Sequence, residues 1–251
     1  MESEPDLVRQ WNTAREASVL LDGFHAIKHA MRFGAEVMIM VSADPAQLDR
    51  LAADLAPDVA AAMAAAARPV SDEALGRLVA RPHPTKMAAL AKRPSGGVAA
   101  GSAGPIVVLD DPRHLGNVGA VVRVAAGFGI GGVVTIGDLD PWHPTVVRAA
   151  AGLHFATTVD RSTTGAPPSG PMFALDPEGR DLRDVTIPDD AVLVFGSERR
   201  GVSDVLRRSA DEVVSLPMRP LVSSYNLATS VAMTLFAWSQ NRPERLRGVA
   251  G

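Results

Sequence analysis

The residues of this sequence that could do chemistry are five polar side chains between residues 117 and 226: Asn117, Arg123, Glu198, Ser224 and Asn226. Arg123 stands among valines and alanines in a helical pattern, where an unpaired charge is costly. Its partner is either an acid such as Glu198 or an anionic ligand such as a phosphate, and spacing alone favours neither. Glu198 could instead act as a general base, or pair with Arg199 or with a helix dipole.

Two of these side chains, Asn117 and Asn226, stand just before helical patterns and could cap those helices. Arg123 follows Asn117 by six residues, nearly two helical turns, so we expect both on roughly the same face. Ser224 and Asn226 allow a second interpretation, in which their loop clasps a ligand while Ser224 touches a substrate. Capping and ligand binding both remain open from the residues alone.

Two short apolar runs near the C-terminal end would position these residues. Residues 191–195 form a run that breaks at 196–201, and residues 213–216 form a second run that ends at Pro217. The polar stretch 222–227 then leads into an apolar helix over 228–238. In open α/β sheets, ligands bind beyond the carboxyl ends of the strands, where such loops gather. We therefore expect a cofactor at these two loops.

Residues 105–251 alternate strand and helix, which predicts an α/β fold with a mostly parallel sheet. Residues 127–132 match the glycine pattern of dinucleotide-binding loops, but they end a helix, so we interpret them as a helix C-cap and turn. Residues 160–171 are predicted to form a surface loop. The expected strands are 106–109, 133–136, 173–175, 191–195 and 213–216, and the expected helices are 118–128, 144–151, one from about 203, and 228–238.

The first 93 residues predict a smaller α/β module, joined to the second by a Gly/Ser/Ala-rich linker over 94–104. Its expected helices are 15–33, stopped by Gly34, then 45–55, the alanine-rich tract 59–67, and a short helix capped by Ser71; its expected strands are 37–41 and 86–92. Residues 105–251 form the second module.

Composition narrows the function classes. The 251 residues are 47% hydrophobic and 21% charged, with a net charge of −3, so no global basic field indicates a nucleic-acid partner. The absence of cysteine excludes disulfides, zinc–thiolate sites and a thiol nucleophile. His25 and His29 have a metal-compatible spacing but no third ligand nearby, so we expect no metal. With no signal peptide pattern and no apolar run of about 20 residues, we expect a cytoplasmic protein without membrane contact.

Three blocks of residues resemble the motifs of the SPOUT superfamily, in its SpoU/TrmH branch of RNA ribose 2′-O-methyltransferases. The blocks are Asn117–Arg123, Leu193–Ser203, and Leu216–Met218 followed by Ser224–Ala228. Their order, spacing and position near the C-terminus together are specific, and the resemblance covers residues 105–240. Residues 15–93 more loosely resemble the L30e-like RNA-binding domain that often precedes this catalytic domain.

The resemblance implies a parallel sheet with a C-terminal deep trefoil knot, an obligate homodimer whose sites are completed by the partner chain, and S-adenosylmethionine as cofactor. The cofactor residues it implies are Phe195, Gly196, Leu216, Met218, Tyr225 and Leu227. By the same resemblance, Arg123 orients the RNA phosphate and helps activate the 2′-hydroxyl. Asn117, Glu198, Ser224 and Asn226 shape the site, with Ser224 near the target ribose. Acceleration comes mainly from in-line positioning, without a metal.

The sequence departs from the family pattern at Tyr225, where leucine is expected, and at His114 and Leu115 in the first loop. The expected substrate is a structured rRNA or tRNA, and the sequence names neither the RNA nor the nucleotide. Two alternatives remain: a catalytically weak RNA-binding or ribosome-assembly protein with the same fold, and a knotted methyltransferase that modifies a base. Arg123 favours ribose chemistry by resemblance only.

Overall fold

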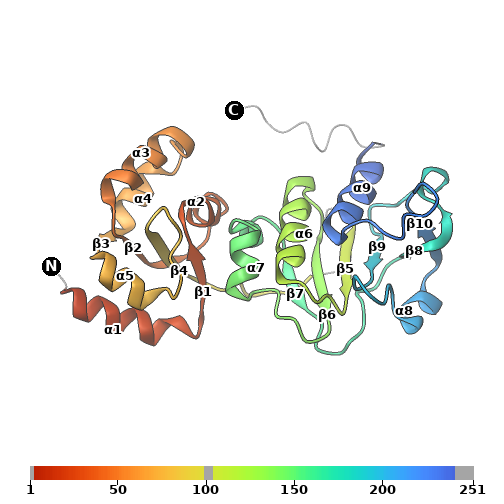
Figure 1. Ribbon diagram of the computed structural model, residues 1–251, viewed down its shortest axis with the longest axis horizontal. Coiled ribbons are helices and arrows are strands. Elements are labelled where there is room, and N and C mark those ends of the chain that lie inside the picture. Colours follow the sequence, from red (N-terminus) through yellow and green to blue (C-terminus); the bar gives the residue numbers. More distant parts are fainter. Residues whose placement is uncertain (1–2, 99–103, 241–251) are drawn as a thin grey trace. The chain divides into compact units, whose positions relative to one another are not determined.

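The computed structural model describes residues 3–98 and 104–240, and the chain divides into two compact units (Figure 1). Unit 1 comprises Met1–Ser95 with the segment Val147–Ala156, and unit 2 comprises Gly96–Val146 with Thr157–Gly251. Of the predicted linker 94–104, residues 99–103 lie outside the described part of the chain. Among the described residues, no helix combines the length and hydropathy needed to cross a bilayer.

Unit 2 is built on a six-stranded sheet in which every pair of neighbouring strands is parallel. The strands follow the order β10-β8-β9-β5-β6-β7. Their bounds are β5 Ile106–Asp110, β6 Gly132–Ile136, β7 Val159–Arg161, β8 Met172–Asp181, β9 Val192–Phe195 and β10 Glu212–Ser215. The central strands β5 and β9 are buried along their whole length, which explains their unbroken apolar sequences. The prediction of a mostly parallel α/β sheet is confirmed.

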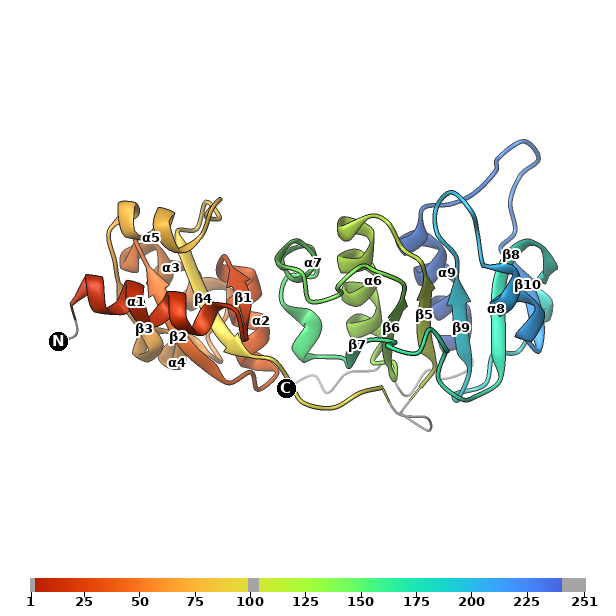
Figure 2. The same ribbon diagram turned by 90° about the horizontal axis from the view of Figure 1, so that it is seen from below.

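Helices cover both faces of this sheet (Figures 1 and 2). They are α6 Leu115–Phe128, α8 Asp204–Ser209 and α9 Leu227–Ser239, with the 3-10 turn η2 Leu182–Asp184. Helix α7 Pro144–Ala149 begins in unit 2 and ends in the segment 147–156 of unit 1, which also contains the 3-10 turn η1 Leu153–Phe155. Helices α6 and α9 pack against each other, while Leu206 of α8 joins a core with alternate residues of β5, β8 and β9. Helix α6 ends as predicted, because Gly129 takes the left-handed conformation with φ 60°.

Unit 1 contains a four-stranded mixed sheet in the order β1-β4-β2-β3. The strands are β1 Ser18–Asp22, β2 Val37–Ser42, β3 Ala67–Pro69 and β4 Met87–Lys92; the helices are α1 Glu4–Arg15, α2 Phe24–Arg32, α3 Pro45–Leu55, α4 Ala60–Ala66 and α5 Asp72–Leu78. The predicted elements from β2 to β4 are confirmed. Ser71 caps α5 as expected, with its hydroxyl oxygen accepting from Ala74 N at 3.1 Å.

Two local predictions were wrong. Residues 15–33 do not form one helix, because Val19, Leu20 and Leu21 are buried in β1, which pairs antiparallel with β4. Gly23, with φ 94°, then separates β1 from α2. A buried apolar run this short fits a strand or a helix equally well, so the choice depended on a partner about 70 residues away. The predicted surface loop 160–171 also begins inside a strand, β7.

Candidate active site

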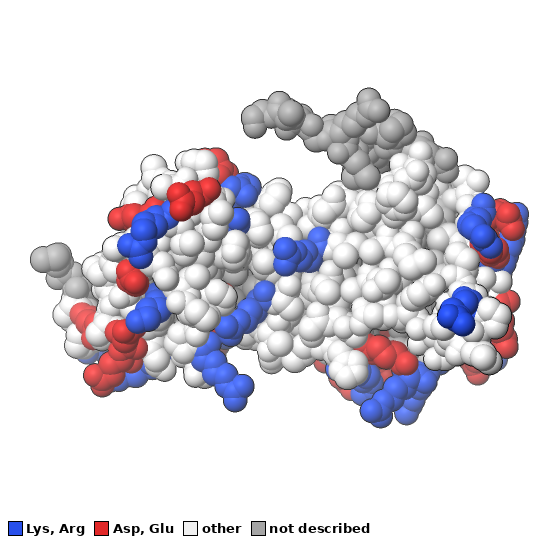
Figure 3. Space-filling model, turned by 45° about the horizontal axis from the view of Figure 1, so that its top comes forward, with Lys and Arg blue, Asp and Glu red and all other residues white. Residues whose placement is uncertain are grey.

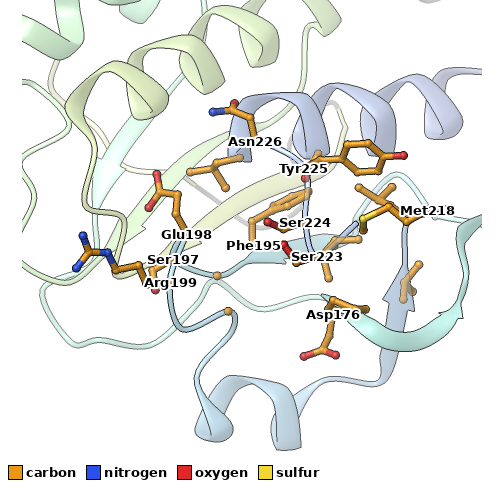
Figure 4. A pocket seen from close by; sticks show the side chains of 18 residues that line it. Asp176, Phe195, Ser197, Glu198, Arg199, Met218, Ser223, Ser224, Tyr225 and Asn226 are labelled. Atoms are coloured by element: carbon orange, nitrogen blue, oxygen red, sulfur yellow. The ribbon is translucent and has the colours of Figure 1, made fainter. Parts of the chain in front are cut away.

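A cavity of about 610 Å³ opens in unit 2 beyond the carboxyl ends of β9 and β10 and beside the middle of β8 (Figure 4). Three segments form most of its wall: the middle of β8, the loop after β9, and the loop between β10 and α9. The lining residues are Leu175, Asp176, Pro177, Phe195, Gly196, Ser197, Glu198, Arg199, Gly201, Val214, Leu216, Met218, Ser223, Ser224, Tyr225, Asn226, Leu227 and Ser230. This is the sheet edge at which the sequence predicted a cofactor.

The loop after β9 is closed by its own backbone. Ser197 and Gly201 exchange two hydrogen bonds, at 3.1 and 3.0 Å, and Gly201 has a φ of 67°. A Cβ on Gly196 would lie 1.8 Å from the carbonyl carbon of Gly201, so a side chain at Gly196 would collide with the returning backbone. Ser203 N also donates to the buried carboxylate of Asp110 at 2.7 Å, which ties the loop to the end of β5.

Asn226 is the N-cap of α9, and its Oδ1 accepts from Ala228 N at 2.9 Å. The capping interpretation is therefore confirmed for this residue. The same side chain also donates from Nδ2 to Oδ1 of Asn117 at 3.1 Å. Its amide thus serves two partners, and capping does not exclude a role at the cavity, whose wall Asn226 also forms.

Asn117 does not cap its helix, contrary to the prediction. Helix α6 begins earlier, at Leu115, with His114 at the N-cap and without a side-chain capping bond. Asn117 lies inside the first turn, and its Nδ2 donates to Oε1 of Glu198 at 2.6 Å. The directions of these bonds are coupled. Because Ala228 N–H needs an acceptor, the side-chain oxygen of Asn226 must face it, and the amide nitrogen of Asn226 then faces Asn117. Asn117 accepts this bond with its oxygen, so its amide nitrogen is left to donate to Glu198. One hydrogen-bond chain therefore joins residues from all three sequence blocks.

Arg123 lies apart from this network. Its side chain is exposed on α6 and does not line the cavity. Within residues 3–98 and 104–240 it makes no ion pair or side-chain hydrogen bond. Of the two alternatives left open for Arg123, the pairing with Glu198 is therefore not formed, and the Glu198 carboxylate accepts from Asn117 instead. The expected shared face with Asn117 was wrong. Six residues turn an α-helix by about 600°, which leaves the two side chains about 120° apart.

The cavity gathers most of the residues singled out from the sequence. All six residues assigned to the cofactor line it, and so do Glu198, Ser224 and Asn226. Sequence reasoning missed Leu175, Asp176 and Pro177 in the middle of β8. They reach the cavity because Leu175 is in register with Phe195 on the neighbouring parallel strand, and this pairing is set by the tertiary structure. In Figure 4 the Asp176 carboxylate points toward α8, where it pairs with Arg207 at 3.4 Å.

The two histidines considered for a metal lie one turn apart on α2. Their ring centroids are 6.4 Å apart, and Nδ1 of His29 lies 2.9 Å from the carbonyl oxygen of Ala151. In the described part of the chain, no three His, Asp or Glu side chains gather in a way that could hold a metal ion.

Comparison with known proteins places this geometry in a family. Residues 104–236, more than half of the chain, match the model of the "SpoU rRNA Methylase family". A 23S rRNA (adenosine(1067)-2′-O)-methyltransferase from Streptomyces laurentii is 30% identical over 167 residues, which are 58% of this chain and 57% of that protein. A ribosomal RNA small subunit methyltransferase G 2 from Syntrophobacter fumaroxidans is 34% identical over 139 residues, 54% of this chain and 27% of that protein. The chain thus spans less than two thirds of the length of these relatives.

Solved structures share the fold over nearly the whole chain. The SpoU methyltransferase AviRb from Streptomyces viridochromogenes, in complex with AdoMet, has a TM-score of 0.74 at 21% identity, covering 94% of this chain and 98% of AviRb. An AdoMet-bound rRNA methyltransferase from Sinorhizobium meliloti has a TM-score of 0.72 at 22% identity, covering 95% of this chain and 93% of that protein. With the family model matching the part of the chain that contains the cavity and its hydrogen-bond chain, the protein belongs to the SpoU rRNA methylase family.

Proposed function

We propose that this protein transfers a methyl group from S-adenosylmethionine to a ribose 2′-hydroxyl of rRNA or tRNA. The observation that carries the proposal is the hydrogen-bond chain Asn226–Asn117–Glu198 beside a cavity lined by the residues assigned to the cofactor. Membership of the SpoU family supports it, as does the ribose 2′-O-methyltransferase among the relatives.

The cavity fits the proposed cofactor in size and lining. Its volume of about 610 Å³ lies within the range typical of small-molecule sites. Phe195, Leu216, Met218 and Leu227 offer apolar surface for an adenine ring, and the two loops bring backbone N–H and C=O groups to the same wall. Ser223 and Ser224 add hydroxyl groups that can meet the polar parts of the ligand (Figure 4). When bound, S-adenosylmethionine supplies a methyl group already activated by its sulfonium.

Because the donor is activated, the protein's own contribution is mainly positioning. The 2′-hydroxyl must approach the methyl carbon in line with the bond to sulfur and lose its proton as it attacks. We assign Arg123 to the RNA phosphate and to activation of that hydroxyl, and Ser224 to the neighbourhood of the target ribose. Asn117 holds the Glu198 carboxylate in one orientation at the edge of the cavity.

We further propose that the protein is a homodimer in which Arg123 completes the site of the other protomer. Helices α6 and α9 contain one charged residue between them, Arg123, and they pack side by side. Phe236 of α9 is 59% exposed. Figure 3, which turns the side of these helices forward, shows a broad area of unit 2 without charged side chains. A second copy would cover this apolar face, and Arg123, which is exposed and does not line its own cavity, would then face a neighbour.

Four finer features complete the proposal. Residues 1–93 serve as an L30e-like RNA-binding domain, and residues 105–251 form the catalytic domain. The C-terminal segment is threaded as a deep trefoil knot, which is supported by its path from β10 at the sheet edge back to α9 beside α6. The fourth feature is a cytoplasmic location.

The test is calorimetric titration of the full chain with S-adenosylmethionine, followed by transfer of labelled methyl groups into total rRNA and tRNA. We expect one site per chain with a dissociation constant of about 1 μM, and label recovered in 2′-O-methylated nucleosides after digestion. Label in a base would favour the knotted base methyltransferase. RNA binding without cofactor binding, with RNA present or absent, would favour the catalytically weak RNA-binding protein.

A further inference from the structure

The loop between β10 and α9 forms one wall of the cavity with little regular structure to hold it. Six of its residues line the cavity: Leu216, Met218, Ser223, Ser224, Tyr225 and Asn226. Within residues 217–225, the backbone groups exchange one hydrogen bond, from Val222 N to Arg219 O at 3.3 Å. Residues 219–226 are all exposed. With so few backbone hydrogen bonds, this loop needs a side-chain contact to keep a single conformation.

The backbone of this loop is also held in a costly conformation. Leu221 has a φ of 72°, in the left-handed region that a branched side chain rarely adopts, and its side chain is fully exposed at 105%. Pro217 and Pro220 carry no N–H and cannot add backbone hydrogen bonds. Such a conformation persists when surrounding contacts determine it.

The side chain of Tyr225 supplies that contact. Its hydroxyl donates to the carbonyl oxygen of Pro217 at 3.0 Å, across eight residues. Pro217 lies between Leu216 and Met218, which both line the cavity, and Figure 4 shows the Tyr225 ring extending toward Met218. Tyr225 directly precedes Asn226, which is fixed by its bonds to Ala228 N and Asn117. The hydroxyl therefore ties the start of the loop, at Pro217, to the N-terminal end of α9, which Asn226 holds in place.

We propose that Tyr225 is a positioning residue whose hydroxyl latches this loop closed against the bound cofactor and slows its release. The proposal rests on the proposed function, because the ligand is S-adenosylmethionine. Leucine, the residue expected here from the family pattern, has no donor and could not make this bond. The latch is therefore a property of this chain, and it gives the departure at Tyr225 a physical role.

The experiment compares the full chain with Tyr225→Phe, which removes only the hydroxyl, and Tyr225→Leu, which also removes the ring. Val222→Ala is the matched control, because Val222 lies in the same loop, is exposed, and does not line the cavity. Three quantities are measured: the dissociation constant and release rate of S-adenosylmethionine, hydrogen exchange of the amides in 218–224, and the thermal midpoint.

We expect Tyr225→Phe to raise the dissociation constant about three- to tenfold, mainly through faster release, as the loss of one hydrogen bond predicts. Amide exchange in 218–224 should become faster, and the thermal midpoint should stay unchanged, because the loop lies outside the core. Tyr225→Leu should match Tyr225→Phe if the hydroxyl is the latch. Val222→Ala should leave all three quantities unchanged.

The latch is overturned if Tyr225→Phe binds the cofactor as tightly as the unaltered chain with unchanged exchange, or if Val222→Ala weakens binding equally. A lower thermal midpoint without a change in cofactor affinity would also overturn it, since that result describes a purely structural bond. If the unaltered chain binds no S-adenosylmethionine, with or without RNA, the proposed function fails and so does the cofactor part of the latch. In that case, comparing amide hydrogen exchange in 218–224 between the unaltered chain and Tyr225→Phe still shows whether the hydroxyl holds the loop.

Discussion

The two loops that form most of the cavity wall are held closed by different means. The loop after β9 is closed by its backbone, through the paired bonds of Ser197 and Gly201. The loop before α9 is closed by side chains, through Tyr225 at one point and Asn226 at its end. A backbone-closed loop tolerates most side-chain changes but no added bulk at its glycines. A side-chain-closed loop is sensitive to the loss of single polar atoms, each with a modest effect.

The largest expected effect comes from adding one methyl group to the backbone-closed loop. In Gly196→Ala, the new Cβ would lie 1.8 Å from the backbone of Gly201, which cannot give way as a flexible side chain could. We expect loss of S-adenosylmethionine binding and a fall in unfolding free energy of about 1–3 kcal/mol, measured by calorimetry and denaturant unfolding. Gly127→Ala is the control, because a Cβ there meets nothing within 4 Å. Normal cofactor binding by Gly196→Ala would show that the loop is not held as described.

A substitution outside both loops should lower the rate of methyl transfer without changing cofactor binding. Arg123→Ala removes an exposed charge from α6 without touching either loop. We expect methyl transfer to fall about a hundredfold or more, because positioning and charge stabilisation are lost, while cofactor affinity stays nearly the same. Labelled transfer into RNA and calorimetry give the two quantities. Weakened cofactor binding would show that Arg123 supports the cavity instead.

The connection between the two loops can be tested at Asn117. Asn117→Asp replaces the amide that donates to Glu198 with a second carboxylate. Repulsion between the two carboxylates raises the pKa of one of them above its ordinary range. The resulting loss of stability and cofactor affinity is therefore present at high pH and disappears as pH falls through that raised pKa. We expect a loss of about 1 kcal/mol, measured by unfolding from about pH 8 to about pH 5. A pH-independent loss would mean that the two groups do not interact.

The smallest effect should come from substitutions that separate the two roles of Asn226, which caps α9 and donates to Asn117. Asn226→Ser keeps an oxygen for Ala228 N but loses the donor to Asn117, whereas Asn226→Ala loses both. We expect Asn226→Ala to lower the unfolding free energy by about 1 kcal/mol and Asn226→Ser by only a few tenths. Both should weaken methyl transfer alike if the bond to Asn117 orients Glu198. Full methyl-transfer activity in Asn226→Ser would show that Asn226 acts only as a helix cap and that its bond to Asn117 does not orient Glu198.

Local signals were sufficient to predict most of the elements of this protein. Continuous apolar runs marked β5, β6 and β9 because a parallel sheet buries both of its faces. Gly129 and Ser71 marked helix ends because their backbone conformation and side-chain chemistry act within one turn. The spacing of polar residues after β9 and before α9 located the cavity, since parallel strands end at one edge of a sheet.

What the sequence could not decide depended on distant partners. The run in β1 became a strand because β4, about 70 residues later, pairs with it. Asn117 binds Glu198 rather than capping its helix, because the first turn of α6 meets the loop after β9, and the two residues are 81 positions apart in the sequence. The hydroxyl of Tyr225 donates to the carbonyl oxygen of Pro217 because the loop folds back and brings these two residues together. Residue types and order determine which groups are available and where loops begin, while the tertiary structure decides which groups meet, because those contacts form only when the whole sheet assembles.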